Sequence, residues 1–289
     1  MAKLMQKGDS GAAVVKLQEN LMSLGFALPR FGADGGLGDE TLTAVARFRA
    51  ERGLLAVPDD VPGTVPVRIV EAIAAEVKAK TEQGLPANFV DVRGQHGRPG
   101  LSTSQPHRPW KQITGITLHQ TAALIGEKES TWFSVPIHLG VTRKGKIIQL
   151  YSFTDRTNHA HNLNAADVGI EVDGFYEGVE GDVTTFWRPK SEPNRKPLKP
   201  TPEQIVALRE AVRWIRDVVN GFGGKLKFIH AHRQSSKDRQ SDPGSRLWRE
   251  VGVWAQNELG LADGGKGFTV GDGLPIPEKW DARYAGVKF

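Results

Sequence analysis

Histidine and aspartate residues stand at several places where β-prone runs end. His119 closes one such run. His230 and His232 lie on another, and Asp242 follows ten residues after His232. Two imidazoles and one carboxylate are a ligand set of zinc hydrolases, which keep the fourth position open for water. Because alternate residues of a strand share a face, His230 and His232 point the same way and only one of them needs to bind a metal. The alternative is that these are ordinary core or surface histidines.

The elements that position these residues are predicted between residues 111 and 262. The β-prone segments are, in chain order, 113–118, 135–141, 146–151, 167–172 and 227–231. A helix is predicted from Pro202 to Gly221, because Thr201 is a good N-cap and Gln204 stands at the third helical position. A last helix is predicted over 245–259. Strands mixed with long helices indicate an α/β domain, with a central mixed β-sheet flanked by helices.

The remaining segments predict a modular chain. Residues 1–80 are expected to form a small all-α domain, because apolar residues recur at helical spacing in three segments: 14–24, 41–51 and 67–80. Residues 81–110 carry glycine and proline at short intervals, which predicts a linker. The proline-rich residues 176–200 predict a surface loop, with a lid beside the site as the alternative. Residues 263–289 form a Gly-rich C-terminal tail, and the sequence leaves open whether it docks.

Composition excludes several classes of site and partner. The chain of 289 residues has no cysteine, which excludes disulfides, iron–sulfur clusters and thiolate zinc sites. Its 38 basic and 33 acidic residues give a net charge of +5, spread along the chain. No basic helix or aromatic–basic motif is present, so we expect no nucleic-acid partner. We also expect no signal peptide and no transmembrane segment, and therefore synthesis in the cytoplasm.

Five segments, taken together and in order, resemble the zinc-dependent N-acetylmuramoyl-L-alanine amidases. This is the type 2 amidase family, which is similar to the peptidoglycan-recognition proteins. The segments are ITLHQTA (116–122), PIHL with RKGKIIQ (136–149), DRTNHA (155–160), VGIE (168–171), and AHR with DPG (231–233 and 242–244). The resemblance implies an α/β amidase domain over residues 111–262.

The resemblance also implies a cofactor and roles for individual residues. It implies Zn²⁺ as the cofactor, with His119, His232 and Asp242 as the metal ligands. Glu171 matches the catalytic carboxylate, which would move a proton from water to the leaving amine. His159 matches a residue that lines the site, as a donor to the developing oxyanion, although Asn158 replaces the family's tryptophan.

One position departs from the family pattern. Two residues before the third ligand, where the family often has a lysine that stabilises the tetrahedral intermediate, this chain has Gln240. A glutamine donates a hydrogen bond without charge, and the neighbouring Arg239 and Lys237 are alternatives for this role. His230 is interpreted as a structural histidine, because the spacing to Asp242 and the following arginine both belong to His232.

The first part of the chain resembles a second family. The segments GDSG (8–11), VVKLQ (14–18) and DGGLG (34–38) are similar to the three-helix peptidoglycan-binding domain. A plain three-helix bundle is the alternative. A binding domain beside a hydrolase raises the local substrate concentration without new catalytic contacts.

Together the two resemblances imply a peptidoglycan hydrolase that cuts the amide bond between N-acetylmuramic acid and L-alanine. Peptidoglycan is the expected partner, and we expect a monomer. The order of domains resembles modular phage endolysins, which a holin releases to act on the cell wall in the periplasm. An antibacterial effector injected by a secretion machine and a cytosolic wall-recycling amidase are alternatives, and so is a non-catalytic peptidoglycan-recognition protein.

Overall fold

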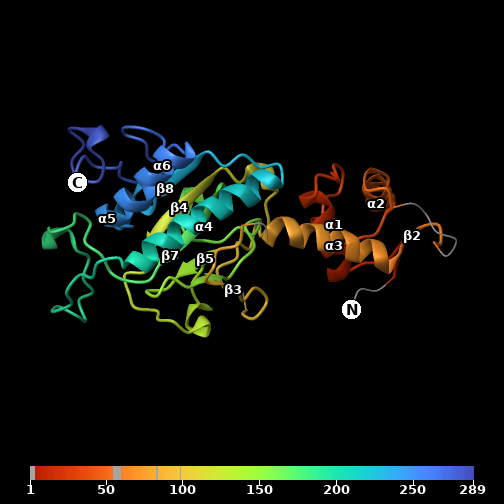
Figure 1. Ribbon diagram of the computed structural model, residues 1–289, viewed down its shortest axis with the longest axis horizontal. Coiled ribbons are helices and arrows are strands. Elements are labelled where there is room, and N and C mark those ends of the chain that lie inside the picture. The colour runs from red at the N-terminus through yellow and green to blue at the C-terminus, as the bar shows by residue number, and fades with distance from the viewer. Residues whose placement is uncertain (1–3, 55–59, 83, 98) are drawn as a thin grey trace. The chain divides into compact units, whose positions relative to one another are not determined.

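The computed structural model describes residues 4–54, 60–82, 84–97 and 99–289. Small parts of the predicted N-terminal domain and linker therefore lie outside the described residues. The chain divides into two compact units. The first is formed mainly by the described part of Met1–Gln83, and the second by Gly84–Phe289 apart from Gly221–Gly223. Figure 1 shows the first in red to orange and the second in yellow to blue.

The described residues of the first unit form three helices and a small β-ribbon. The helices are α1 (Ala12–Ser23), α2 (Asp39–Glu51) and α3 (Val67–Glu82). β1 (Met5–Gln6) pairs antiparallel with β2 (Thr64–Val65), which adds strands to a unit expected to be all-α. The buried side chains come from one face of each helix, and include Leu17, Leu21, Val45, Phe48, Ile69 and Ile73.

The second unit is built on a six-stranded mixed sheet in the order β3-β6-β5-β7-β4-β8. Its strands are β3 (Phe89–Asp91), β4 (Gly115–Gln120), β5 (Leu139–Val141), β6 (Ile147–Gln149), β7 (Asp167–Val172) and β8 (Phe228–Ala231). β5, β7, β4 and β8 run parallel to one another, whereas β5 and β6 form the predicted antiparallel hairpin. The expected mixed sheet is therefore confirmed, and the carboxyl ends of its parallel strands meet at one edge.

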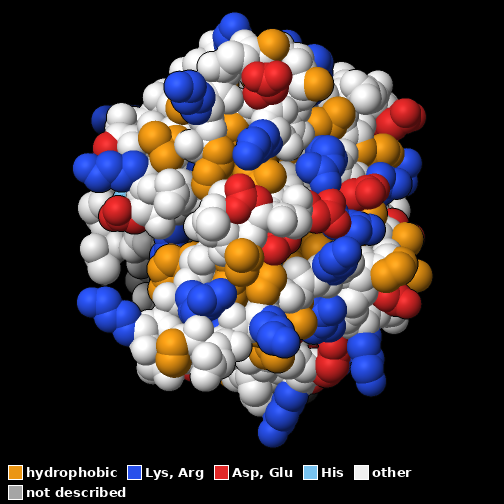
Figure 2. Space-filling view, turned by 90° about the vertical axis from the view of Figure 1, so that its left-hand side faces the viewer, with side chains coloured by type: hydrophobic (Ala, Val, Ile, Leu, Met, Phe, Trp, Pro, Cys, Tyr) orange, Lys and Arg blue, Asp and Glu red, His pale blue; other side chains and the backbone are white. Residues whose placement is uncertain are grey.

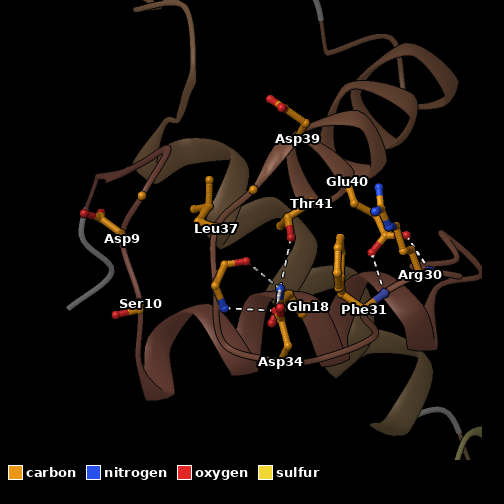
Figure 3. A pocket seen from close by; sticks show the side chains of 13 residues that line it. Asp9, Ser10, Gln18, Arg30, Phe31, Asp34, Leu37, Asp39, Glu40 and Thr41 are labelled. Carbon is orange, nitrogen blue, oxygen red and sulfur yellow. Dashed lines mark hydrogen bonds between the residues drawn. The ribbon is translucent and has the colours of Figure 1, made fainter.

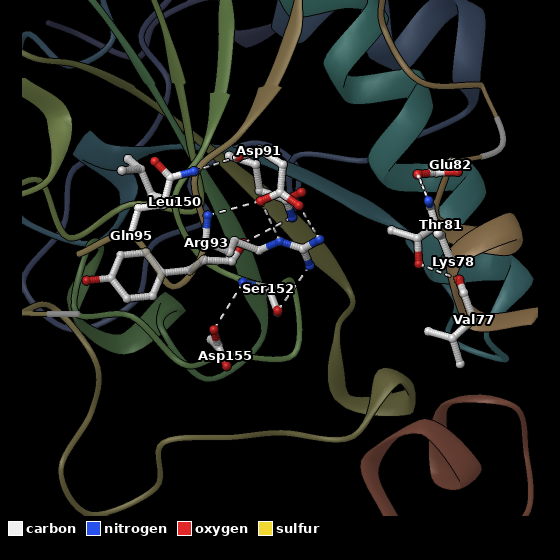
Figure 4. Close-up of polar contacts among 12 residues, drawn as sticks. Val77, Lys78, Thr81, Glu82, Asp91, Arg93, Gln95, Leu150, Ser152 and Asp155 are labelled. Atoms are coloured by element: carbon white, nitrogen blue, oxygen red, sulfur yellow. Dashed lines mark hydrogen bonds and ion pairs between the residues drawn. The ribbon is translucent and has the colours of Figure 1, made fainter. Parts of the chain in front are cut away.

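Strand β3 corrects the prediction of a linker over residues 81–110. It pairs parallel with β6 at the sheet edge, and the Phe89 ring lies 4.9 Å from that of Trp214. Just after the strand, the Arg93 guanidinium bonds the Asp91 carboxylate at 2.7 Å and Ser152 Oγ at 3.2 Å (Figure 4). A strand of three residues is too short to show alternation. The sequence signal was therefore dominated by the glycines and prolines around it.

Helices pack against this sheet as the sequence predicts. α4 (Pro202–Gly221) runs alongside the strands in Figure 1. Its start is a reciprocal capping box, because Gln204 N donates to Thr201 Oγ1 at 3.1 Å and Thr201 N donates to Gln204 Oε1 at 3.0 Å. The C-terminal helix comprises α5 (Ser245–Leu247), a wider π-helical stretch (Trp248–Val253) and α6 (Trp254–Leu259).

The C-terminal tail docks on the second unit. Ile276, Trp280 and Tyr284 are buried in one cluster with Ala231 and Trp248. Trp280 is only 1% exposed. The tail is therefore part of the core beside β8, where the sequence left its role open.

Two features of the structure concern possible partners: the apolar length of its helices and the distribution of charge on its surface. Within the described residues, no helix is both long and apolar enough to cross a membrane. On the face drawn in Figure 2, basic side chains are interspersed with acidic and apolar ones and form no continuous stripe.

Candidate active site

The predicted site residues come together where the parallel strands end. His119 lies near the end of β4, directly opposite Glu171 of β7 in the strand register. His232 follows the last residue of β8, which pairs with the other side of β4. Three neighbouring strands therefore deliver three of the predicted residues to one place. Crevices at the carboxyl ends of parallel strands are where α/β proteins bind their ligands.

His119, His232 and Asp242 form a buried cluster of converging donor atoms. The two Nδ1 atoms of His119 and His232 are 2.8 Å apart, and His232 Nδ1 lies 3.0 Å from Asp242 Oδ2. The three donor atoms all lie within 4.8 Å of one another. Two imidazoles and a carboxylate at this spacing fit the donor set of a catalytic zinc site. Each of these residues is at most 5% exposed.

The surroundings keep the His119 imidazole neutral and hold the Asp242 carboxylate in a fixed orientation, as metal ligands require. Burial, reinforced by His232 and His159, holds the pKa of His119 well below its usual value, so its imidazole is neutral. The other carboxylate oxygen of Asp242, Oδ1, accepts the backbone N–H of Gln120 at 2.9 Å. Asp242 is thereby fastened to the residue next to His119, and Oδ2 is left to face His232. Hydrogen bonds of this kind orient metal ligands.

Glu171 lies half-buried beside the cluster. Burial and the negative charge of Asp242 raise the pKa of Glu171 to about 8, whereas the nearby charge of Arg239 lowers it. A carboxyl group whose pKa lies near neutrality can both accept and donate a proton at physiological pH. A bound cation would favour its ionised form. The position and the environment of Glu171 therefore suit a general acid–base.

His159 lies behind His119. Its Nδ1 is 3.0 Å from His119 Nε2, and its Nε2 is 3.3 Å from the carbonyl oxygen of Asp167. Burial lowers the pKa of His159 to about 3, so this imidazole is also neutral. Gly169 makes room for the ring, because a Cβ there would lie 2.6 Å from His159 Nδ1. Both ring nitrogens therefore face protein atoms.

His230 and His161 lie outside this cluster of three side chains. His230 Nδ1 is 2.7 Å from Asp167 Oδ2, and its ring stacks between those of Phe228 and Phe268. His161 is exposed, and its ring centroid is 6.1 Å from that of His232. The structural role expected of His230 agrees with these contacts.

The segment before Asp242 is a 3₁₀ turn, Lys237–Arg239, followed by Gln240. All four residues are exposed. Lys237 Nζ lies 3.5 Å from Asp272, away from the cluster. The charge of Arg239 lowers the pKa values of both Glu171 and His119. Gln240 contributes its backbone oxygen to Arg233.

Two residues in this network escaped sequence reasoning. Gln120 anchors Asp242, and Asp167 accepts from the Thr117 hydroxyl and contacts His230. The sequence could have indicated Gln120, because it directly follows the predicted ligand His119. Nothing in the sequence indicated Asp167 apart from its position at the start of a predicted strand.

The first unit has a pocket of about 440 Å³ around the loop between α1 and α2. Gln18 braces this loop by donating to Asp34 at 2.9 Å and to Thr41 at 3.0 Å (Figure 3). The Glu40 carboxylate accepts the backbone N–H of Phe31 at 3.0 Å. Phe31 itself is 58% exposed at the pocket.

Comparisons with known proteins agree with the class of site. Residues 109–245 match the family model described as N-acetylmuramoyl-L-alanine amidase, and this part of the chain is a type 2 amidase domain. A probable N-acetylmuramoyl-L-alanine amidase of Bacillus licheniformis is 38% identical over 79 residues, 27% of this chain and 22% of that protein. The amidase CwlL of the same species is 33% identical over 86 residues, 30% of this chain and 23% of CwlL. The chain thus matches less than a quarter of each relative's length.

Solved structures of low similarity were also found. The amidase endolysin LysCS from Clostridium intestinale has 16% identity and a TM-score of 0.41, covering 62% of this chain and 99% of LysCS. Wild-type Drosophila PGRP-LB has 16% identity and a TM-score of 0.39, covering 57% of this chain and 94% of that chain.

Proposed function

We propose that this chain is a zinc-dependent peptidoglycan hydrolase that cuts the amide bond between N-acetylmuramic acid and L-alanine. The observation that carries the proposal is the buried convergence of His119, His232 and Asp242, with Glu171 directly opposite His119 on the next strand. The family match over residues 109–245 supports the choice of substrate bond.

The residues have distinct tasks in this reaction. A zinc ion held by His119, His232 and Asp242 would supply Lewis acidity, which polarises the scissile carbonyl and activates water. Glu171 accepts a proton as water adds to the carbonyl carbon, and passes it to the amide nitrogen as the C–N bond breaks. The products are the lactyl carboxylate on the glycan and a stem peptide with a free L-alanine amine.

We assign His159 a positioning task in place of the oxyanion donor expected from the sequence. With His119 Nδ1 facing the other ligands, its proton sits on Nε2 and is donated to His159 Nδ1. His159 then carries its own proton on Nε2, which faces the Asp167 carbonyl. This chain of donors fixes the tautomer and the orientation of His119.

Stabilisation of the tetrahedral intermediate is proposed for the segment before Asp242. Gln240 remains a proposed neutral donor, and Arg239 is a second candidate because its charge already reaches Glu171. Comparing Gln240→Ala with Arg239→Gln separates them, since the residue in this role should lower kcat about 10²–10³-fold when changed.

We further propose that the first unit binds peptidoglycan through the pocket around Phe31 and Gln18. We also propose that the chain acts on the cell wall in the periplasm as an endolysin, with a secreted effector as the alternative. Expression in a Gram-negative host with and without a holin tests this setting. Lysis that needs the holin supports an endolysin, and lysis without it contradicts that role.

The experiment that tests the activity is digestion of purified peptidoglycan with a chelator, without it, and after zinc is added back. We expect cleavage that the chelator abolishes and zinc restores. Retention on peptidoglycan without cleavage, at saturating zinc, would instead identify a non-catalytic recognition protein.

A further inference from the structure

Arg233 is a buried guanidinium next to the predicted ligand His232. It is 1% exposed, and in the described part of the chain no carboxylate pairs with it. Its Nε donates to the carbonyl oxygen of Pro275 at 3.0 Å, and its Nη1 donates to that of Gln240 at 2.5 Å. Burying an arginine without an acidic partner is costly. The burial of the Arg233 guanidinium therefore has to be explained by contacts other than a salt bridge.

Aromatic rings from the C-terminal tail enclose this guanidinium. The Cζ of Arg233 lies 4.9 Å from the ring centroid of Trp280 and 4.9 Å from that of Phe289. Cation–π contacts of this kind strengthen when they are shielded from water. Phe289 reaches its place because Gly178 has no side chain, since a Cβ there would lie 2.4 Å from the Phe289 ring. The tail's backbone also bonds this segment, through Leu274 N to Arg233 O at 2.7 Å.

Arg233 connects the tail to both ends of the segment that carries two ligands. It follows His232 directly, and its backbone N–H donates to the carbonyl oxygen of Asp242 at 3.0 Å. Its side chain holds the carbonyl of Gln240, two residues before Asp242. One residue thus fastens the start and the end of the loop from His232 to Asp242. The planar guanidinium holds the carbonyl oxygens of Pro275 and Gln240 through two different nitrogens in a fixed fork, whereas a lysine offers a single nitrogen on a flexible stem.

We propose that Arg233 is a positioning residue for the metal site, and that Trp280 and Phe289 of the C-terminal tail hold it in place. The tail is then part of the site, because it fixes the loop on which His232 and Asp242 present their donor atoms. This inference rests on the proposed metal-dependent function.

Metal affinity of the full chain tests the proposal without any measure of turnover. Zinc binding is measured by competition with a chromophoric chelator for the native chain, Arg233→Met and Arg213→Met. Arg213 is the matched control, because its Cζ lies 4.7 Å from the Trp254 ring, away from the metal ligands. We expect Arg233→Met to bind zinc about 10–100-fold more weakly, as for other residues that orient ligands. Arg213→Met should bind like the native chain.

The visible absorption of the cobalt-substituted protein is a second readout, because it reports the geometry of the metal site. We expect an altered spectrum for Arg233→Met and a native one for Arg213→Met. If circular dichroism shows that Arg233→Met does not fold, two variants of Trp280 in the C-terminal tail test the proposal in its place. Trp280→Leu removes the ring and should weaken zinc binding about tenfold. Trp280→Phe keeps a ring and should restore most of it, since Trp280 Nε1 has no hydrogen-bond partner among the described residues.

The outcomes separate this inference from the proposed function. Native zinc affinity in folded Arg233→Met or Trp280→Leu, while the native chain binds zinc, would overturn the positioning role alone. Failure of the native chain to bind zinc would overturn the proposed metal site and this inference with it.

Discussion

In the proposed reaction, the side chains around His119, His232 and Asp242 divide between holding a metal, moving a proton and fixing orientation. Glu171 is the residue that we propose for proton transfer, because it lies opposite His119 in the strand register and its pKa is raised to about 8 by burial and by Asp242. His159 and Gln120 contact the ligands directly, whereas Arg233 acts through the loop between two of them. The ligands are therefore surrounded by residues that constrain them from several elements.

The raised pKa of Glu171 predicts a pH-dependent stability of the metal-free protein. The folded state retains this proton at pH values where the unfolded chain has released it, so Glu171 lowers stability progressively as pH rises from about 4.5 to about 8. Glu171→Gln removes this cost. We expect the Tm difference, variant minus native, to grow between about pH 5 and pH 8 when a chelator is present. Glu258→Gln, at an exposed position, is the control, and a constant difference for Glu171→Gln would contradict the raised pKa.

The role of His159 is tested by its effect on metal binding. His159→Phe removes the ring nitrogen that faces His119 Nε2. If His159 orients His119, zinc affinity should fall about 10–100-fold. An oxyanion donor would instead leave zinc affinity native and lower only kcat. Chelator competition and steady-state kinetics on the same preparation distinguish the two.

Secondary-structure elements bring the site together through the sheet. β4 carries His119, β7 carries Glu171, and the chain leaving β8 carries His232, so three neighbouring parallel strands set the spacing. β3 extends the opposite edge and packs against α4 through Phe89 and Trp214. This packing makes residues 89–91 part of the second unit.

Because β3 packs against α4, we expect a substitution in this strand to lower the free energy of unfolding, although its segment resembles a linker in sequence. Phe89→Ala should lower the free energy of unfolding by about 1–3 kcal/mol, because it removes the ring contact with Trp214. Val206→Ala, at a 57% exposed position on α4, should change it by less than about 0.5 kcal/mol. Urea denaturation measures both, and equal effects would show that β3 contributes no packing energy.

Local patterns explain what the sequence predicted and what it missed among these elements. The capping box of Thr201 and Gln204 and the β5–β6 hairpin depend on neighbouring residues, and both were predicted. The contact of His159 with His119 depends on long-range packing, which no local pattern encodes. The docked tail likewise depends on a few aromatic residues separated by turns. The ligand set was predicted only because the resemblance supplied what spacing alone left open.

The full chain combines an amidase domain with a unit proposed to bind the cell wall. A tethered binding unit raises the local substrate concentration without touching the reacting bond. Affinity for peptidoglycan and cleavage are therefore separable properties of this chain.

Binding by the first unit is expected to depend on the exposed Phe31 ring. In a Glu171→Gln background, Phe31→Ala should weaken retention on insoluble peptidoglycan about two- to tenfold, the range of one aromatic contact. Val61→Ala is the matched control, because Val61 is 59% exposed in the same unit and does not line the pocket. A sedimentation assay measures retention, and equal retention of both variants would place binding elsewhere.

The measurement that tests the amidase account most directly is product analysis of peptidoglycan digests by mass spectrometry. The native chain and Glu171→Gln are compared at the same measured zinc content. We predict that the native chain releases stem peptides beginning with L-alanine and leaves glycan strands intact. Glu171→Gln should retain zinc and lose about 10²–10⁴-fold in rate. Cleaved glycosidic bonds, or native rates from Glu171→Gln, would contradict the account.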